Sequence, residues 1–349
     1  MPDAPSTALE VVTFQAGECG RAGSPLYERI LSGVADDVRA GGISAEVLDG
    51  RDDDPFASAL ALRLLGAVHR MVLEGRAPDL AALYPSVGGD PTTGDPAATF
   101  LATLRSNRDE VARRLVDGVQ TNEVGRSAVL VGGYAEVSRR TGLPLRLLEV
   151  GASAGLNLRW DHFAYDTGSQ VAGDAASPVR FEGVWEGPPP LLPEHFDLIA
   201  ERRGCDRNPL DATSDDGRLT LLSFTWPDQL ERIARLEAAI EVARRVPVAV
   251  DRADAVTWVE SQLATARPGT ASVVVHSIVL QYLPSDARRR FLAAVEHGGR
   301  KATASAPVAW LRMEPAGDRA ELRLTMWPGG AEEVLATSGY HGRPIWWGA

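Results

Sequence analysis

Cysteine is nearly absent from this chain: Cys19 and Cys205 are the only two among 349 residues, and they lie far apart. A disulfide framework and a cysteine-based zinc cluster are therefore excluded, and we expect no bound metal. Basic residues are outnumbered, with 36 Lys and Arg against 47 Asp and Glu and a formal net charge of -11. Because no basic stripe offsets this charge, we expect neither a nucleic acid nor an anionic membrane as partner.

Segments that would direct the chain into or across a membrane are missing as well. Residues 1–5 contain no basic region and no apolar core, so we expect no secretory signal. No apolar run is long enough to span a bilayer. These absences predict a cytoplasmic protein, and the chain length predicts about two domains.

The first third of the chain shows helical periodicity without the alternation typical of strands. We therefore predict a helical N-terminal cap domain over residues 1–120. Ser24 and Pro25 are a typical N-cap and first helical residue. A second helix is predicted from about Pro55, and a third over residues 97–119.

From residue 145 onward, apolar strands alternate with helical segments, which predicts a mostly parallel sheet with helices on its faces. Residues 320–327 and 339–347 follow each other without a helix, which predicts an antiparallel C-terminal pair at the sheet edge. We assign residues 121–349 to an α/β, Rossmann-like domain of the class I methyltransferase type. Residues 165–219 are predicted to be an insertion, a hairpin over the site.

The most informative segment is residues 145–158, LRLLEVGASAGLNL. An apolar strand runs into a turn bracketed by Gly151 and Gly155, and a helix is predicted to follow. Such a turn directs free backbone N–H groups outward, toward an anionic or polar ligand group. Glu149 narrows the interpretation, because a carboxylate before the turn disfavours phosphate and favours an ammonium or a sulfonium.

Several interpretations of this turn compete. The dinucleotide pattern Gly-x-Gly-x-x-Gly fails. Gly-x-Ser-x-Gly does match, which would make Ser153 a hydrolase nucleophile with His276 or His341 as base, but the upstream sequence is helical and lacks an oxyanion segment. A tight turn without a ligand is a third interpretation. We favour the first motif of S-adenosylmethionine-dependent methyltransferases.

Other polar residues extend this site. A carboxylate after the second strand would bind both ribose hydroxyls, and Asp206 is the candidate, with Glu182 as the alternative. In the other interpretation, Asp206 is a turn aspartate that accepts hydrogen bonds from its own backbone. Asp254 would meet the adenine, although a helix N-cap suits it better. The predicted cofactor-binding set is Glu149, Gly151, Ala152, Ser153, Gly155, Asn157, Asp206, Asp254 and Ser277.

The acceptor side is predicted from polar residues at the join of the two domains. Asn122, Arg126 and Arg159 are the candidate substrate-binding residues, with Thr121 or Asn122 as an ordinary helix cap in the alternative interpretation. The candidate bases are Glu123, His276 and Tyr282. For His276, inside an apolar strand, a satisfied core histidine is the default interpretation.

Six segments carry a wider resemblance: Ser24–Tyr27, Gln120–Ser127, Leu148–Asn157, Gly204–Asp211, Trp226–Gln229 and Gly339–Gly342. Together they resemble an uncharacterised bacterial family that is catalogued as a domain of unknown function, family 2332. The resemblance covers nearly the whole chain and implies a Rossmann-like domain similar to class I methyltransferases. Ser153 departs from the methyltransferase pattern, which frequently has a glycine there.

The function predicted from the sequence is binding of S-adenosylmethionine and methyl transfer to a small-molecule acceptor. Alignment of the acceptor and exclusion of water would supply most of the rate. The alternatives are the serine hydrolase, a non-catalytic binding protein with the cofactor fold, and another reaction that consumes adenosylmethionine.

Overall fold

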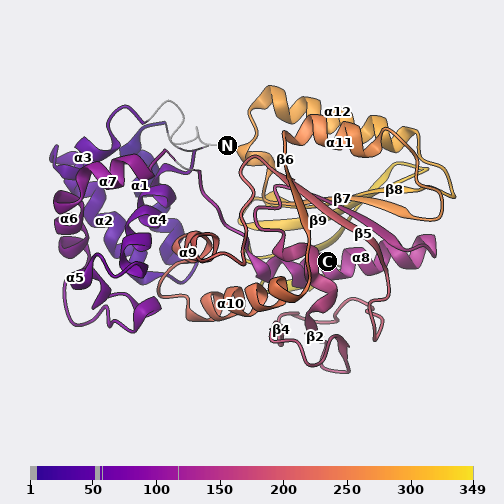
Figure 1. The fold of residues 1–349 in the computed structure, drawn as a ribbon, viewed down its shortest axis with the longest axis horizontal. Helices are drawn as coiled ribbons and strands as arrows, with labels where there is room; N and C mark the ends of the chain where they lie inside the picture. Colours follow the sequence, from indigo (N-terminus) through magenta and orange to yellow (C-terminus); the bar gives the residue numbers. More distant parts are fainter. Residues whose placement is uncertain (1–5, 52–55, 57, 117, 349) are drawn as a thin grey trace. The chain divides into compact units, whose positions relative to one another are not determined.

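The computed structural model describes every residue of the chain except 1–5, 52–55, 57, 117 and 349 (Figure 1). Its internal contacts divide the chain into two units. Unit 1 comprises Met1–Thr121 and Ser214–Ala234, and unit 2 comprises Asn122–Thr213 and Arg235–Ala349. The division thus differs from a single cut after residue 120, because residues 214–234 return to the first unit.

Unit 1 is helical. Its helices are α1 (Ala8–Arg21), α2 (Pro25–Arg39), α3 (Ile43–Leu48), α4 (Leu60–Leu73), α5 (Pro78–Ala81), α6 (Pro96–Ser106), α7 (Arg108–Arg114) and α9 (Asp215–Ser223), with a 3-10 turn η1 (Pro85–Val87). The predicted start of α2 is confirmed, since the Ser24 side chain accepts a hydrogen bond from the Tyr27 N–H. Pro55, the predicted start of the second helix, lies outside the described residues, and α4 begins at Leu60.

The continuous helix predicted over residues 97–119 is wrong. It breaks at Asn107, whose φ of -131° is not helical. The Asn107 side chain donates to the Thr103 carbonyl at 2.9 Å, which caps α6 before α7 starts at Arg108. Asparagine competes with the helix ladder in this way, which is why it often ends helices.

Two of the resembling motifs meet inside unit 1. The Asp228 carboxylate accepts a hydrogen bond from the Ser24 hydroxyl at 2.6 Å and one from the Leu26 N–H at 3.1 Å. The Tyr27 and Trp226 rings lie 6.2 Å apart. An acid at a helix N-terminus satisfies orphan N–H groups and the helix dipole. These contacts tie residues 214–234 to the first helices and explain the second segment of unit 1.

Unit 2 is built on one eight-stranded sheet. The strands are β1 (Leu145–Val150), β5 (Ile199–Asp206), β6 (Ala249–Arg252), β7 (Ala271–Ser277), β8 (Val308–Ala316), β9 (Arg319–Trp327), β10 (Ala331–Ser338) and β11 (Ile345–Trp347). Their order is β11-β10-β9-β8-β7-β1-β5-β6, and the five strands from β8 to β6 run parallel. Every residue of β1 and β7 is buried, as predicted from their apolar runs. The predicted α/β class with a mostly parallel sheet is confirmed.

Helices cover both faces of this sheet (Figure 1). They are α8 (Ser127–Thr141), α11 (Ala255–Leu263), α12 (Ser285–Arg300) and α10 (Leu230–Arg245), of which unit 2 contains the part from Arg235 onward. Leu148 and Val150 of β1 pack with Trp258 of α11 and Phe291 of α12. On the other face, α8 approaches so closely that a Cβ on Gly133 would lie 2.5 Å from Leu311.

The antiparallel part of the sheet is larger than predicted. Instead of one pair, β8, β9, β10 and β11 form a meander in which each strand pairs with the next. The predicted pairing of 320–327 with 339–347 is wrong, because β10 lies between them. The strand β10 was not predicted, because it begins with the acidic segment Ala331-Glu-Glu-Val. It follows a glycine turn at Gly329 and Gly330.

The insertion forms a second, three-stranded sheet of order β3-β2-β4. Its strands are β2 (Ala164–Asp166), β3 (Val171–Gly173) and β4 (Arg180–Phe181). The β2–β3 pair is the antiparallel hairpin expected in this region, and β4 adds to it in parallel. Among the described residues of the whole chain, no helix is both long enough and apolar enough to cross a membrane.

Candidate functional site

The order of the parallel strands reverses between β1 and β7. From β1 the chain adds β5 and then β6 on one side, and it adds β7 and then β8 on the other. In open α/β sheets, ligands bind beyond the carboxyl ends of the strands at such a switch point. The candidate site is therefore formed by Gly151–Gly155 after β1 and by the residues after β7.

Both segments have unusual backbone conformations. In the turn after β1, Gly151, Ser153 and Gly155 have φ values of 68°, 51° and 66°. After β7, Ile278 has a φ of 55°. A β-branched residue in the left-handed region is costly and persists only where its surroundings enforce it. Of the three non-glycine residues with positive φ in the described part of the chain, two thus flank the switch point.

The N–H groups of the glycine turn do not face outward as predicted. The Ala152 N–H donates to the Cys205 carbonyl at 3.0 Å, and the Ser153 N–H donates to Asp206 Oδ2 at 2.9 Å. The Leu156 N–H donates to Asn122 Oδ1 at 2.9 Å. These donors are already occupied within unit 2, so the expectation of an open cradle is wrong for them. The turn is held in place by the protein itself.

The α-helix predicted after the turn is also wrong. Residues Leu156–His162 form a 3-10 helix, η3, with a non-helical conformation at Arg159. The Arg159 guanidinium donates to the carbonyls of Gly155 at 2.7 Å and Ala154 at 3.3 Å. Those carbonyls are the acceptors that a regular helix would use for its own ladder.

Glu149, the last but one residue of β1, is the most unusual group at the switch point. It is 3% exposed, and its Oε2 atom has no hydrogen-bond partner. It is in register with Val275 and Leu311, so it lies on the α8 face of the sheet. Burial raises the pKa of the Glu149 carboxyl to about 8, and Asp206 adds to this effect while Arg159 and Arg126 oppose it. At neutral pH the carboxyl is therefore mostly protonated.

Asp206 ends β5, next to the turn after β1. Its Oδ2 accepts from the Ser153 N–H at 2.9 Å, and its Oδ1 accepts from the Asn208 N–H at 2.8 Å. The second bond is the local turn contact that the alternative interpretation expected. The structure thus brings Asp206 to the glycine turn. Glu182 instead follows β4 in the small sheet, where its carboxylate binds Arg180.

The segment before α8 is joined to the segment after the turn by side-chain hydrogen bonds. Asn157 Oδ1 accepts from the Ser127 hydroxyl at 2.7 Å, and Asn157 Nδ2 donates to the Glu123 carbonyl at 3.3 Å. The helix cap at Thr121 or Asn122, the alternative interpretation of this segment, is wrong. Glu123 caps the 3-10 turn η2 (Val124–Arg126) by accepting from the Gly125 N–H, and α8 begins only at Ser127.

Arg126 reaches the end of β7. Its guanidinium donates to the Ser277 carbonyl at 2.8 Å and to the Tyr340 carbonyl at 3.1 Å. Arg159 similarly donates to the Val246 carbonyl at 2.7 Å, and burial lowers the pKa of Arg159 to about 10. The structure thus places both predicted substrate-binding arginines around the switch point, where they brace backbone carbonyls.

The remaining predicted residues have local roles. Asp254 is the N-cap of α11 and accepts from the N–H groups of Val256 and Thr257. Both ring nitrogens of His276 are engaged, by Glu314 and by Trp310, so neither can take a proton from Ser153. Tyr282, in the 3-10 turn η4 (Leu280–Tyr282), is 44% exposed.

The sequence prediction missed Glu314 on β8 and the strained Ile278. Glu314 Oε1 accepts from His276 Nδ1 at 2.6 Å and from the Val279 N–H at 3.0 Å. A signal was present in Trp310-Leu-Arg-Met-Glu314, where polar side chains alternate with buried ones on a strand. Such alternation marks one face that must find polar partners.

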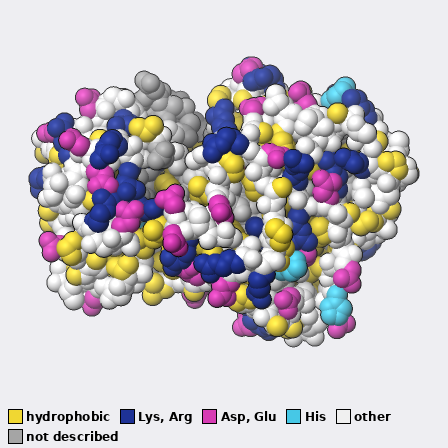
Figure 2. Space-filling view, viewed as in Figure 1, with side chains coloured by type: hydrophobic (Ala, Val, Ile, Leu, Met, Phe, Trp, Pro, Cys, Tyr) yellow, Lys and Arg dark blue, Asp and Glu magenta, His cyan; other side chains and the backbone are white. Residues whose placement is uncertain are grey.

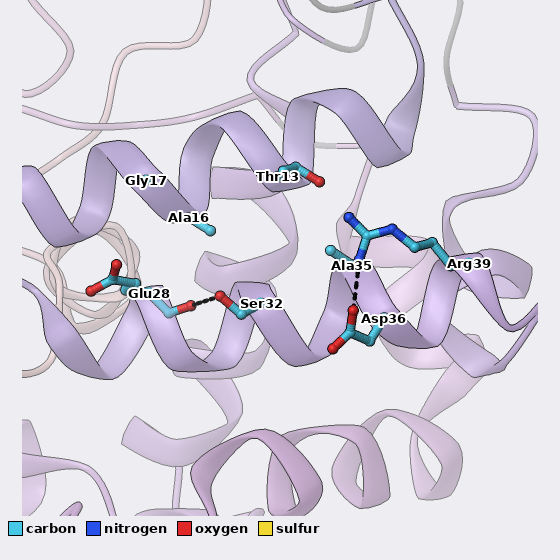
Figure 3. A pocket seen from close by; sticks show the side chains of 8 residues that line it. All are labelled: Thr13, Ala16, Gly17, Glu28, Ser32, Ala35, Asp36 and Arg39. Carbon is cyan, nitrogen blue, oxygen red and sulfur yellow. Dashed lines mark hydrogen bonds and ion pairs between the residues drawn. The ribbon is translucent and has the colours of Figure 1, made fainter.

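Two shallow cavities are lined by other residues. One of about 220 Å³ lies between α1 and α2 and is shown in Figure 3, where Arg39 pairs with Asp36. The other, of about 200 Å³, is lined by α11 and α12 and includes Arg267 and Lys301. Neither contains a predicted site residue.

Basic and acidic side chains lie interspersed on the face shown in Figure 2. In the described parts of the chain, no group of three His, Cys, Asp or Glu residues is arranged to hold a metal.

These features define an α/β protein with a mostly parallel central sheet and a constrained polar site at its switch point. The chain belongs to the family DUF2332, described as an uncharacterized protein conserved in bacteria, whose sequence model matches residues 10–347. The resemblance to this bacterial family is therefore confirmed, whereas the likeness to class I methyltransferases stays a prediction. No curated protein and no solved structure matches the chain at a significant level.

Proposed function

We propose that unit 2 binds S-adenosylmethionine at the switch point and transfers its methyl group to a small-molecule acceptor. The observation that carries the proposal is the buried Glu149 carboxyl, whose Oε2 has no partner. A cationic ligand group placed against this oxygen would favour the ionised carboxylate and relieve its isolation. A phosphate-bearing ligand would instead keep this carboxyl protonated and gain no charge attraction from it, so the site favours a sulfonium or an ammonium.

Asp206 supports a ribose in the same ligand. A carboxylate has about four lone-pair positions, and the N–H groups of Ser153 and Asn208 use one on each oxygen. The remaining positions are available to two adjacent hydroxyls. The strand order β6-β5-β1-β7-β8 corresponds to the order 3-2-1-4-5 of nucleotide-binding sheets, in which the acid after the second strand has this role. The antiparallel meander is a departure from a dinucleotide domain.

Methyl transfer from a sulfonium requires alignment more than covalent participation by the protein. The residues around the turn are held by hydrogen bonds before a ligand arrives, which suits an in-line displacement that depends on position. A general base is needed only for an acceptor of high pKa. Of the three candidate bases, His276 is engaged by two partners and Glu123 by the Gly125 N–H, whereas Tyr282 is 44% exposed. Tyr282 is therefore the base that we retain.

The experiment is calorimetric titration of the whole protein with S-adenosylmethionine, S-adenosylhomocysteine and NAD. We expect both adenosyl ligands to bind, with no binding of NAD, whose phosphates would approach Glu149. Glu149→Gln should weaken adenosylmethionine at pH 8, where the wild-type carboxyl ionises easily. Glu182→Gln, at an exposed residue directly after β4, is the matched control and should leave affinity unchanged. Binding of NAD alone, or of none of the three, would refute the proposal.

A further inference from the structure

A connected set of hydrogen bonds lies on the α11–α12 face of the sheet, opposite to Glu149. The Trp310 indole N–H donates to His276 Nε2 at 3.0 Å. Because that nitrogen accepts, the imidazole carries its proton on Nδ1, which donates to Glu314 Oε1 at 2.6 Å. The Phe291 ring packs against the same imidazole in a T-shaped arrangement, with the ring centroids 5.5 Å apart. The tautomer and the orientation of His276 are therefore fixed.

The same carboxylate oxygen also holds the backbone beyond β7. It accepts from the N–H groups of Val279 at 3.0 Å and Leu280 at 3.4 Å. Burial alone would raise the pKa of Glu314, but the bonds from His276 and these N–H groups lower it below its ordinary value. The group is therefore an ionised carboxylate, and charge-assisted bonds are stronger than neutral ones.

These bonds enforce a conformation that the chain would not adopt unaided. Ile278, between His276 and Val279, has a φ of 55°, which is unfavourable for a β-branched residue. The hydrogen bonds from the N–H groups of Val279 and Leu280 to Glu314 offset the cost of the left-handed conformation at Ile278. As a result, the Val279 side chain rests on the glycine turn: a Cβ on Gly151 would lie 2.7 Å from Val279 Cγ2.

We propose that Glu314, oriented by His276 and Trp310, is a positioning residue that fixes Val279 against Gly151 and thereby holds the glycine turn in its binding geometry. Glu314 acts through Val279 and does not contact the ligand. The effect on ligand affinity rests on the proposed function. The effect on the turn is independent of it, so the two can be tested separately.

The first test is hydrogen exchange of the full protein, without ligand, followed by mass spectrometry. Glu314→Ala should make the amides of residues 151–156 and 278–282 exchange at least about tenfold faster, as expected for loss of charge-assisted bonds that hold a local segment. Glu314→Gln keeps the side-chain volume and one oxygen acceptor, so it should give a smaller increase in the exchange rate. It replaces Glu314→Ala in the experiment if the alanine variant does not fold. Glu321→Ala is the matched control, since Glu321 is the β9 partner of Glu314 in the sheet register and its carboxylate binds Arg323. Unchanged exchange at residues 151–156 in the Glu314 variants would overturn the inference.

The second test is a double-mutant cycle on affinity for S-adenosylhomocysteine. If Glu314 acts through Val279, Glu314→Ala and Val279→Ala should each weaken binding about tenfold, and the double variant should be no weaker than either. Additive losses would contradict the route through Val279. A wild-type protein that binds no adenosyl ligand would refute the proposed function instead, while the exchange experiment would still decide the inference.

Discussion

Replacing Glu149 by glutamine should stabilise the ligand-free protein, and the gain should grow as pH rises. The side chain is 3% exposed and Oε2 has no partner, so ionisation leaves an isolated buried charge. Charged groups surround it on three elements: Arg126 on η2, Arg159 on η3 and Asp206 on β5. The arginines oppose the effect of burial, but the pKa still rises from 4.5 to about 8.

The magnitude follows from this shift. The folded state binds the proton more tightly than the unfolded chain, so the carboxyl's contribution to stability is fully present below about pH 4.5 and is lost as pH rises toward 8. At pH 7 the unfolded chain is ionised and the folded group is mostly protonated, which costs about 3 kcal/mol of unfolding free energy relative to pH 4. Glutamine has nearly the same shape and no proton to lose, so Glu149→Gln should remove this pH-dependent cost.

Thermal unfolding at pH 5 and pH 8 measures the effect. A change of 1 kcal/mol moves the melting temperature by roughly 2–4 °C in a domain of about 150–250 residues. We expect the variant to melt several degrees higher than the wild type at pH 8 and nearly together with it at pH 5. Glu182→Gln, at an exposed position, should change neither. A Glu149→Gln variant that melts lower than the wild type at pH 8 would refute the reasoning, because the wild-type carboxyl would then be stabilised as an anion.

Four further outcomes are expected. Gly151→Val should abolish binding of adenosylhomocysteine, because its Cβ would meet Val279 at 2.7 Å in a left-handed conformation; affinity within twofold of the wild type contradicts this. Asp206→Ala should weaken that binding by roughly 1.5–3 kcal/mol, by calorimetry, whereas loss only in Glu182→Ala would move the ribose elsewhere. Arg126→Lys should lower any confirmed methyl transfer with little change in cofactor affinity, since lysine cannot reach the carbonyls of Ser277 and Tyr340 together; full activity would make it a dispensable brace. Asp228→Ala should destabilise unit 1 by about 1.5–3 kcal/mol in urea unfolding, because the start of α2 loses a charged acceptor; an unchanged midpoint would contradict that.

The central strands could be predicted because a strand buried on both faces has a nearly continuous apolar sequence. Every residue of β1 and β7 is buried, and both read as short apolar runs between turns. The meander could be predicted only in part. Residues 331–334 place two glutamates in β10, where partial exposure tolerates them, so apolar periodicity gave no strand signal.

The candidate site, too, could be predicted only in part. Glu149 and the left-handed turn follow from the local order of strand, acid and glycine. The partners of the arginines do not, because Arg126 bonds to a carbonyl 214 positions away and Arg159 to one 87 positions away. The helix expected after the turn is lost to a local contact, since Arg159 donates to the carbonyls of Gly155 and Ala154, four and five residues earlier. Side-chain bonds to distant backbone carbonyls leave no periodic trace in a sequence.

The central claim is that a cation binds against the buried carboxyl of Glu149. Calorimetry of adenosylmethionine binding at pH 7, in buffers of different ionisation enthalpy, counts the protons released. With a free pKa of about 8 and an ionised carboxylate in the complex, the wild type should release about 0.9 proton more than Glu149→Gln. The comparison cancels any proton taken up by the amino group of the ligand. Binding with the same proton count in both proteins would contradict the account.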